Sequence, residues 1–318
     1  MPEPLIVVDD LVVEYPSKGV RRHAFRALKG VSVDIRPGET VGLVGESGSG
    51  KTTLGRAVLG LAPVTGGSIK FKGREIGSLP RRERRALSSE IQVVFQDPYS
   101  SLNPSLTIEQ TLTEPLMVRK MPKGDATARV RNLLDQVKLP RDALGRLPRE
   151  FSGGQRQRIA IARALALSPE FIVCDEPVSA LDLSTQARVL DLFKEIQETT
   201  GVAYLFISHD LSVVEYLSDR VGVMYLGRLV EVGTAKALYA EPQMPYTQAL
   251  LSAMPDRVVS SRRRIVLKGD VPNPLNPPSG CPFRTRCWRA ETRCEQEVPL
   301  LREVRPNHWA ACHFPGPE

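Results

Sequence analysis

The feature that most constrains the fold is a glycine-rich loop between a predicted strand and a predicted helix. Residues 45–52 read Gly-Glu-Ser-Gly-Ser-Gly-Lys-Thr, follow the apolar run 41–44, and match the pattern G-x-x-x-x-G-K-[ST]. Glycines at this spacing let the backbone wrap around phosphate groups, with N–H groups pointing inward at the start of a helix. Lys51 then supplies a positive charge to the phosphates, and the Thr52 hydroxyl is a ligand for Mg²⁺. The loop predicts an α/β nucleotide-binding fold.

The remaining pattern favours a parallel sheet with helices on both faces. Short apolar runs at 41–44, 171–174 and 203–207 are typical of buried parallel strands, and Cys174 in one of them is expected to be a small buried side chain. Helical periodicity is clear at 126–139 and 185–198. Residues from about 76 to 150 have a mostly helical pattern that interrupts the strand series, which predicts an inserted helical subdomain.

Two carboxylates end the apolar run at 171–174. A phosphate-loop ATPase needs an acid at such a strand end to hold Mg²⁺, and Asp175 fits this requirement. The adjacent Glu176 is placed to activate the attacking water as a general base. Apolar strands that end in Asp are common, so the interpretation depends on the phosphate-binding loop upstream.

Residues 151–156, Phe-Ser-Gly-Gly-Gln-Arg, lie just before a predicted helix. They resemble the signature Leu-Ser-Gly-Gly-Gln of ABC ATPases, with Phe in place of the leading Leu. The resemblance implies that the serine and glycines form a second anion-binding helix start, which closes on ATP held by an opposite subunit. The residues it assigns to this contact in trans are Ser152, Gly153, Gly154, Gln155 and, in the D-loop, Asp182.

Other elements of that family occur in the expected order. Gln96 matches the Q-loop and His209, directly after the run 203–207, matches the switch histidine, so the implied catalytic residues are Glu176, His209 and Gln96. The implied Mg²⁺ ligands are Thr52, Gln96 and Asp175. Tyr15 matches the aromatic residue that stacks on adenine, although a core or surface tyrosine at this position is an equal alternative. The implied ATP contacts are Tyr15, Gly45, Glu46, Ser47, Gly48, Ser49, Gly50, Lys51, Thr52 and Thr53.

The resemblance extends to a subfamily. The segments 53–57 (Thr-Leu-Gly-Arg-Ala), 95–104 (Phe-Gln-Asp-Pro-Tyr-Ser-Ser-Leu-Asn-Pro) and 114–116 (Glu-Pro-Leu) are similar to ATP-binding subunits of dipeptide, oligopeptide and nickel importers, closer to the second, F-type subunit. The implied fold is an α/β phosphate-loop nucleotide-binding domain at 1–254, with an antiparallel β edge and a helical subdomain at about 76–165. A small cysteine-containing extension follows at 255–318.

The same resemblance implies ATP and Mg²⁺ as cofactors and a set of protein partners. These are a second ATPase subunit of the D type, two transmembrane permease subunits and, indirectly, an extracytoplasmic solute-binding protein, with no nucleic acid. No apolar run approaches the roughly 18 residues of a membrane-spanning helix, and the first residues lack the pattern of a secretory signal. We therefore expect a peripheral protein on the cytoplasmic face of the membrane. A non-transport ABC ATPase, a catalytically inactive subunit, and a redox or RNA-binding module based on the basic tail are the alternatives.

Four of the five cysteines fall in the last 38 residues, at Cys281, Cys287, Cys294 and Cys312. A chain that binds cytosolic ATP works in a reducing compartment, where structural disulfides are disfavoured. The remaining possibilities are an iron–sulfur cluster, structural zinc or four free thiols. Intervals of five, six and seventeen residues are looser than the Cys-x₂₋₄-Cys pairs of zinc sites. The similarity of residues 280–287 to peptide-importer ATPases that carry such clusters also favours one [4Fe–4S] cluster, with zinc as the alternative.

Overall fold

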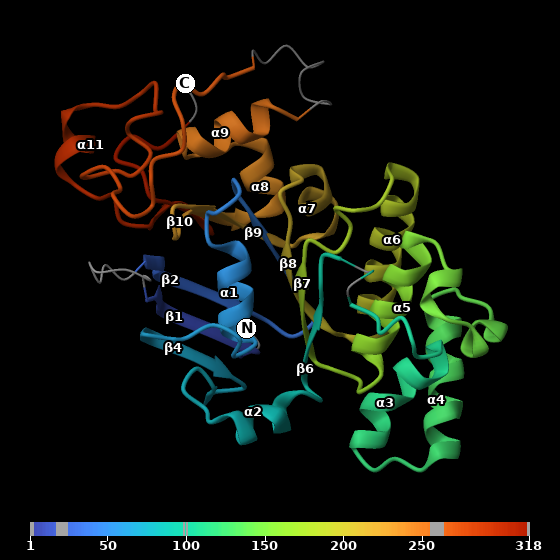
Figure 1. The fold of residues 1–318 in the computed structure, drawn as a ribbon. Helices are drawn as coiled ribbons and strands as arrows, with labels where there is room; N and C mark the ends of the chain where they lie inside the picture. The colour runs from blue at the N-terminus through green and yellow to red at the C-terminus, as the bar shows by residue number, and fades with distance from the viewer. Residues whose placement is uncertain (1–2, 17–24, 98, 100, 255–263, 317–318) are drawn as a thin grey trace. The chain divides into compact units, whose positions relative to one another are not determined.

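The computed structural model describes residues 3–16, 25–97, 99, 101–254 and 264–316. The chain divides into two compact units. The first contains Met1–Arg36, Thr40–Leu79 and Phe206–Glu318, and the second contains Pro37–Glu39 and Pro80–Leu205 (Figure 1). The predicted boundary between residues 254 and 255 falls against residues 255–263, which lie outside the described residues, so it stays a prediction.

The first unit holds an antiparallel sheet of four strands in the order β2-β1-β4-β5. In β1, Ile6, Val8, Leu11 and Val13 are buried, which is the alternation expected of a sheet with one face on a core. This sheet is the predicted antiparallel β edge. Its strands are β1 (Ile6–Tyr15), β2 (Phe25–Ile35), β4 (Gly66–Phe71) and β5 (Arg74–Glu75).

A second row of strands in the first unit leads from the glycine-rich loop to the C-terminus. The fully buried strand β3 (Thr40–Val44) pairs in parallel with β9 (Arg220–Tyr225). From β9 the row continues antiparallel through β10 (Arg228–Thr234), β12 (His308–Ala310) and β11 (Arg302–Arg305). The helices of this unit are α1 (Lys51–Val58), α7 (Leu211–Leu217), α8 (Ala235–Ala240), α9 (Pro245–Ser252) and α11 (Thr292–Gln296).

The second unit is mostly helical. Its helices are α2 (Arg81–Leu87), α3 (Ile108–Val118), α4 (Lys123–Gln136), η1 (Arg141–Gly145), η2 (Pro148–Glu150), α5 (Gly153–Leu165) and α6 (Leu183–Thr200). Its strands are β6 (Ile91–Val94), which pairs in parallel with β7 (Phe171–Asp175), and β8 (Ala203–Ile207), whose last two residues belong to the first unit. Strand β6 lies inside the stretch that we predicted to be mostly helical. The prediction missed it because four residues between helical segments carry too little pattern to be recognised as a strand.

The C-terminal extension shares the core of the first unit. Phe283 is fully buried against Tyr225 of β9 and Tyr246 of α9, with ring centroids 5.4 and 5.3 Å away. Cys281, Cys294 and Cys312 are buried in the same cluster. In Figure 1 the red C-terminal segment accordingly lies beside α9 and β10. The extension therefore depends for its core on apolar residues from residues 1–254, as expected for a short proline-rich segment.

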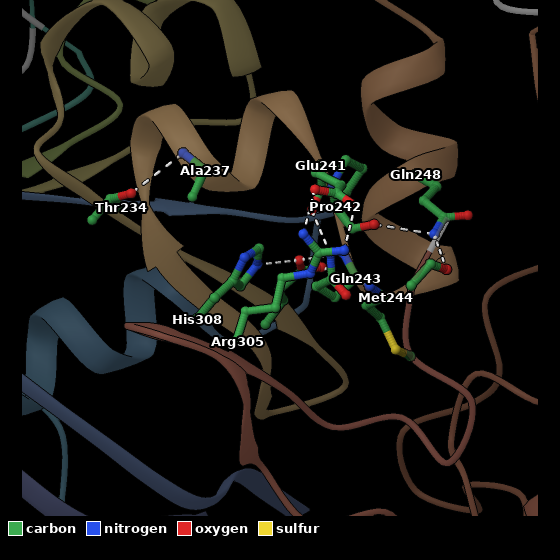
Figure 2. A network of polar contacts seen from close by, with 11 residues as sticks. Thr234, Ala237, Glu241, Pro242, Gln243, Met244, Gln248, Arg305 and His308 are labelled. Atoms are coloured by element: carbon green, nitrogen blue, oxygen red, sulfur yellow. Dashed lines mark hydrogen bonds and ion pairs between the residues drawn. The ribbon is translucent and has the colours of Figure 1, made fainter. Parts of the chain in front are cut away.

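A buried polar network also attaches the extension to β10 (Figure 2). Glu231 is fully buried, and its carboxylate contacts His308 Nε2 of β12 at 2.7 Å. The same carboxylate accepts hydrogen bonds from the backbone N–H groups of Gln243 and Met244, at 2.6 and 3.0 Å. Removing one partner of a buried hydrogen bond, so that the other polar group is left unsatisfied, typically costs about 1–3 kcal/mol. The network therefore fixes the register of β12 on β10.

Within the part of the chain that the structure describes, no helix has the length and apolar character needed to cross a membrane.

Candidate functional site

The glycine-rich loop of the first unit has the conformation that a phosphate-binding loop requires. Gly45 and Gly50 adopt φ values of 145° and 108°, which L side chains rarely adopt. A Cβ on Gly45 would lie 2.2 Å from the carbonyl oxygen of Met224, and one on Gly50 would lie 2.9 Å from Leu28. Gly48, in contrast, is exposed and has open space beside it. The loop is thus packed against the unit on one side and accessible on the other.

Lys51 stabilises this loop from inside. Its side chain is buried, and Nζ donates to the carbonyl oxygens of Gly45 at 2.7 Å and Glu46 at 3.0 Å. Helix α1 begins here at Gly50, without a side-chain cap. Thr52 and Thr53 in the first turn are half-buried. The positive end of the helix dipole, with a buried lysine beside it, makes this helix start suitable for an anion.

Two further predicted residues lie elsewhere in the first unit. Tyr15 is half-buried at the end of β1, opposite Phe25 of β2. His209 is exposed and follows β8, between the buried Ser208 and Asp210, the N-cap of α7. Their contacts with nucleotide stay predictions.

The second unit holds the predicted catalytic acids at the end of β7. Asp175 is the last residue of the strand, and Glu176 follows it with φ of 50°, a left-handed conformation that a non-glycine residue adopts at the expense of strain. Gln96 Nε2 donates to Glu176 Oε2 at 3.0 Å, which joins two residues that the sequence assigned to one catalytic set. The same amide lies 3.4 Å from the Ser179 hydroxyl. Cys174 is fully buried as predicted, and burial raises the pKa of its thiol.

The predicted signature residues form the start of α5. Ser152 is the N-cap: its hydroxyl accepts from the Gln155 N–H at 3.4 Å, and the Gln155 side chain accepts from the Ser152 N–H at 3.0 Å. Gly154 is required by packing, because a Cβ there would lie 2.2 Å from the Thr185 methyl group. This helix start is therefore capped by its own residues and tightly packed on one side.

Asp182 has a comparable local role at the start of α6. Its carboxylate accepts from the Ser184 hydroxyl at 2.7 Å and from the Thr185 N–H at 3.0 Å. These hydrogen bonds lower the pKa of Asp182 to about 2, so the residue carries its charge at any neutral pH. The Thr185 N–H donates to Asp182, and the Thr185 methyl group packs against Gly154. The starts of α5 and α6 are therefore in contact through Thr185.

The four C-terminal cysteines line one small cavity in the first unit, together with apolar residues such as Phe283. Burial raises the pKa of the Cys281 thiol to about 11, and the nearby Cys294, Cys312 and Cys287 add to the increase. All four are free thiols. Among the residues described, no group of three or more His, Cys, Asp or Glu side chains is arranged to hold a metal ion.

Sequence reasoning missed two residues that contact the phosphate-binding loop. Arg286 of the extension forms an ion pair with Glu46, and the Tyr246 hydroxyl of α9 accepts a hydrogen bond from the Glu46 N–H. The available signal was Glu46 itself, since an acid in a loop built to hold anions calls for a cationic partner. Nothing in the local sequence identifies that partner, which lies 240 residues away.

Comparison with known proteins agrees with this geometry. The family model described as ABC transporter matches residues 28–179, and that described as Oligopeptide/dipeptide transporter, C-terminal region, matches residues 230–294. The oligopeptide transport ATP-binding protein AppF of Bacillus subtilis is 50% identical over 294 residues, which are 91% of this chain and 89% of AppF.

Solved structures give the same result. CbiO1 of Clostridium perfringens, part of the ABC transporter complex CbiONQ, has a TM-score of 0.68 at 28% identity, covering 75% of this chain and 91% of CbiO1. The dimeric ATP-binding cassette MJ0796, in a post-hydrolysis state with ADP and phosphate, has a TM-score of 0.65 at 29% identity, covering 72% of this chain and 98% of the cassette. Fold and loop together define a phosphate-loop ATPase of the cassette type. The chain belongs to the ABC transporter family of ATP-binding proteins, and its C-terminal region is of the oligopeptide/dipeptide transporter type.

Proposed function

We propose that this ABC ATPase powers the import of dipeptides or oligopeptides from the cytoplasmic face of a membrane. The observation that carries the proposal is the 50% identity with AppF across 91% of the chain, together with the match of residues 230–294 to the C-terminal region of peptide transporters. The resemblance is closer to the F-type subunit of such importers. Import of nickel or another solute, with the same ATPase role, is the competing assignment.

The proposed reaction is in-line attack of water on the γ-phosphate of ATP, which gives ADP and phosphate. The backbone of residues 45–53 and Lys51 hold the phosphates, and Thr52, Asp175 and Gln96 are the proposed ligands of Mg²⁺, which neutralises developing charge when bound. Glu176 accepts a proton from the attacking water, and His209 contacts the γ-phosphate. The hydrogen bond from Gln96 to Glu176 supports a role for Gln96 in orienting that base.

We assign the start of α5 to the active site of a second ATPase subunit. The proposed contacts in trans are Ser152, Gly153, Gly154 and Gln155, with Asp182, and the dimeric structure of the cassette MJ0796 offers a precedent. A D-type chain as that subunit, and two permease subunits, complete the proposed assembly. The isolated chain is then a poor ATPase whose activity rises with partner subunits. Full activity from a monomer, independent of its concentration, would contradict this assignment.

We also propose that Cys281, Cys287, Cys294 and Cys312 hold one [4Fe–4S] cluster, with Zn²⁺ as the alternative. A cluster distributes its four thiolate ligands over different iron atoms, so these ligands surround a larger volume than the ligands of a single ion. The observation that supports the proposal is that the four thiols line one cavity. Bound iron would stabilise thiolate forms against the burial that raises the pKa values of Cys281, Cys287 and Cys312. The proposed role is structural or sensory, because ATP hydrolysis transfers no electrons.

Reconstitution tests the transport assignment. The chain would be assembled with its partner ATPase and permease subunits in liposomes that contain the matching solute-binding protein. Dipeptides or oligopeptides are expected to stimulate ATP hydrolysis, and Glu176→Gln assemblies should give no stimulation. Stimulation by nickel alone would replace the peptide assignment and leave the ATPase intact.

Iron and sulfide analysis tests the cluster. Anaerobically purified chain should contain iron and sulfide in equal amounts, and Cys287→Ser should lose both. The matched control is Cys174→Ser, which removes a buried thiol in β7 and should leave iron content unchanged. One zinc per chain, without iron, would decide for the alternative.

A further inference from the structure

The phosphate-binding loop is held by a residue of the C-terminal extension. Arg286 Nη1 lies 2.7 Å from Glu46 Oε2, and Arg286 Nη2 lies 2.9 Å from Glu46 Oε1. The two parallel hydrogen bonds form the bidentate arrangement that only arginine provides to a carboxylate. The Arg286 side chain is 8% exposed and that of Glu46 is 26% exposed. This pair is therefore much less screened by solvent than an ordinary surface salt bridge.

The backbone of Glu46 is fixed as well. Its N–H donates to the Tyr246 hydroxyl at 2.9 Å, and its carbonyl oxygen accepts from Lys51 Nζ at 3.0 Å and from the Ser49 N–H at 3.2 Å. Tyr246 is itself fully buried between Tyr225 and Phe283. Glu46 is thus restrained at its carboxylate by the extension and at its N–H by α9. Because Glu46 is the second residue of the loop, these contacts restrain the loop backbone.

The pair also has an electrostatic consequence. ATP brings several negative charges to this loop, and an unpaired carboxylate at Glu46 would repel them. Arg286 neutralises that carboxylate, and the hydrogen bonds to Glu46 raise the pKa of Arg286 above its usual range. Arg286 reaches this position because its own N–H donates to the carbonyl oxygen of the buried Phe283, at 3.0 Å.

We propose that Arg286 is a positioning residue for ATP binding: it neutralises and orients Glu46, so that the loop presents its N–H groups to the phosphates. The extension is then a component of the nucleotide site rather than a separate appendage. The inference rests on ATP binding by this family. It depends neither on the peptide assignment nor on the proposed cluster at the cysteines.

The test measures MgATP binding to the full-length, isolated chain by titration calorimetry. Arg286→Gln should raise the ATP dissociation constant by about 5- to 150-fold, the usual range for coupling between two connected sites. The matched control is Arg284→Gln, two residues earlier. Arg284 bonds the carbonyl oxygen of Ser279 at 2.8 Å, within the extension, and the ATP affinity of this variant should equal that of the wild type. An unchanged dissociation constant in Arg286→Gln would overturn the proposal.

A second substitution separates this role from a purely structural one. If Arg286 acts by neutralising Glu46, then Glu46→Gln in the Arg286→Gln background should restore most of the lost affinity, because no unpaired carboxylate remains. A purely structural role predicts instead that the double variant binds ATP no better than Arg286→Gln. That result would contradict the proposal.

Two milder variants keep the test decisive if Arg286→Gln fails to fold. Arg286→Lys retains the charge but loses the bidentate geometry, and Tyr246→Phe retains the ring packing but loses the acceptor for the Glu46 N–H. Each is expected to weaken ATP binding several-fold, with circular dichroism unchanged. Wild-type affinity in both would overturn the proposal.

Discussion

Two helix starts in this chain are assigned to the phosphates of ATP, and they are built in opposite ways. Helix α1 begins at Gly50 in a left-handed conformation without a side-chain cap, beside the buried Lys51. Helix α5 begins at Ser152 with a complete capping box, and Ser152 is exposed. The first start has no side-chain cap and holds a cation beside it, whereas at the second the side chains of Ser152 and Gln155 accept from two backbone N–H groups.

This difference indicates how the work of binding is divided. The α1 start is restrained by neighbouring elements, including Met224, Tyr246 and Arg286, so that its loop is ordered before nucleotide arrives. Such preorganisation reduces the conformational entropy lost on binding. The first turn of α5 carries Arg156 instead, whose guanidinium donates to the carbonyl oxygen of Phe151 at 2.9 Å and lies over the Tyr99 ring, so this charge is already engaged within the unit. We therefore expect α1 to determine ATP affinity and α5 to affect turnover in the assembled complex.

Glu176→Gln should produce the largest effect and involve neither helix start. Loss of a general base typically lowers turnover by about 10²- to 10⁴-fold, whereas the amide keeps the shape of the side chain and so leaves ATP binding intact. The measurement is the steady-state ATPase rate of the assembled complex, beside MgATP binding to the isolated chain. Near wild-type hydrolysis would show that the proton acceptor is another group.

Lys51→Ala should remove the contribution of the α1 start to ATP affinity. Truncating a buried, hydrogen-bonded charge costs about 2–5 kcal/mol, which corresponds to an ATP affinity lower by about 30- to 4,000-fold. The matched control is Arg56→Ala, which removes an exposed positive charge from the last turn of the same helix and should leave the dissociation constant unchanged. Equal losses in both variants would mean that the general charge of α1, not the loop, attracts nucleotide.

Gly154→Ala should damage the α5 start by packing alone. The new methyl group would lie 2.2 Å from the Thr185 methyl group, and overpacking of this kind typically costs about 1–3 kcal/mol. We expect ATPase activity of the complex to fall about tenfold and ATP binding to the isolated chain to stay at the wild-type level. Thr185→Ser removes the clashing methyl group, so the double variant should recover activity. Weaker ATP binding in Gly154→Ala would contradict the proposed division between the two helix starts.

The two regions also differ in how much of each could be predicted from sequence. The phosphate-binding loop and the acids at the end of β7 follow from local pattern, because each lies directly at the end of an apolar strand. The fold class follows from the same pattern, whereas the antiparallel edge, also predicted correctly, was implied by the resemblance to ABC ATPases. Strand β6 was missed, since Ile91–Val94 is too short to stand out between helical segments. The partnership of Arg286 with Glu46 joins residues 240 positions apart and depends on the packing of Phe283 against Tyr246, which no local pattern records.

Ser152→Ala should have the smallest effect. It tests whether a capping box serves only to stabilise its helix or also contacts nucleotide. Helix α3 begins with an equivalent capping box at Thr107 and Gln110, in the same unit as α5. Ser152→Ala and Thr107→Ala each remove one hydroxyl cap. Each should lower the free energy of unfolding by about 1 kcal/mol, measured by urea titration. Only Ser152→Ala should also lower the ATPase rate of the complex, by about fivefold, because a neutral hydrogen bond to the ligand is worth about 1 kcal/mol. Equal stability losses with no change in either ATPase rate would mean that Ser152 only caps α5, and the contact in trans would then have to come from the glycines that follow it.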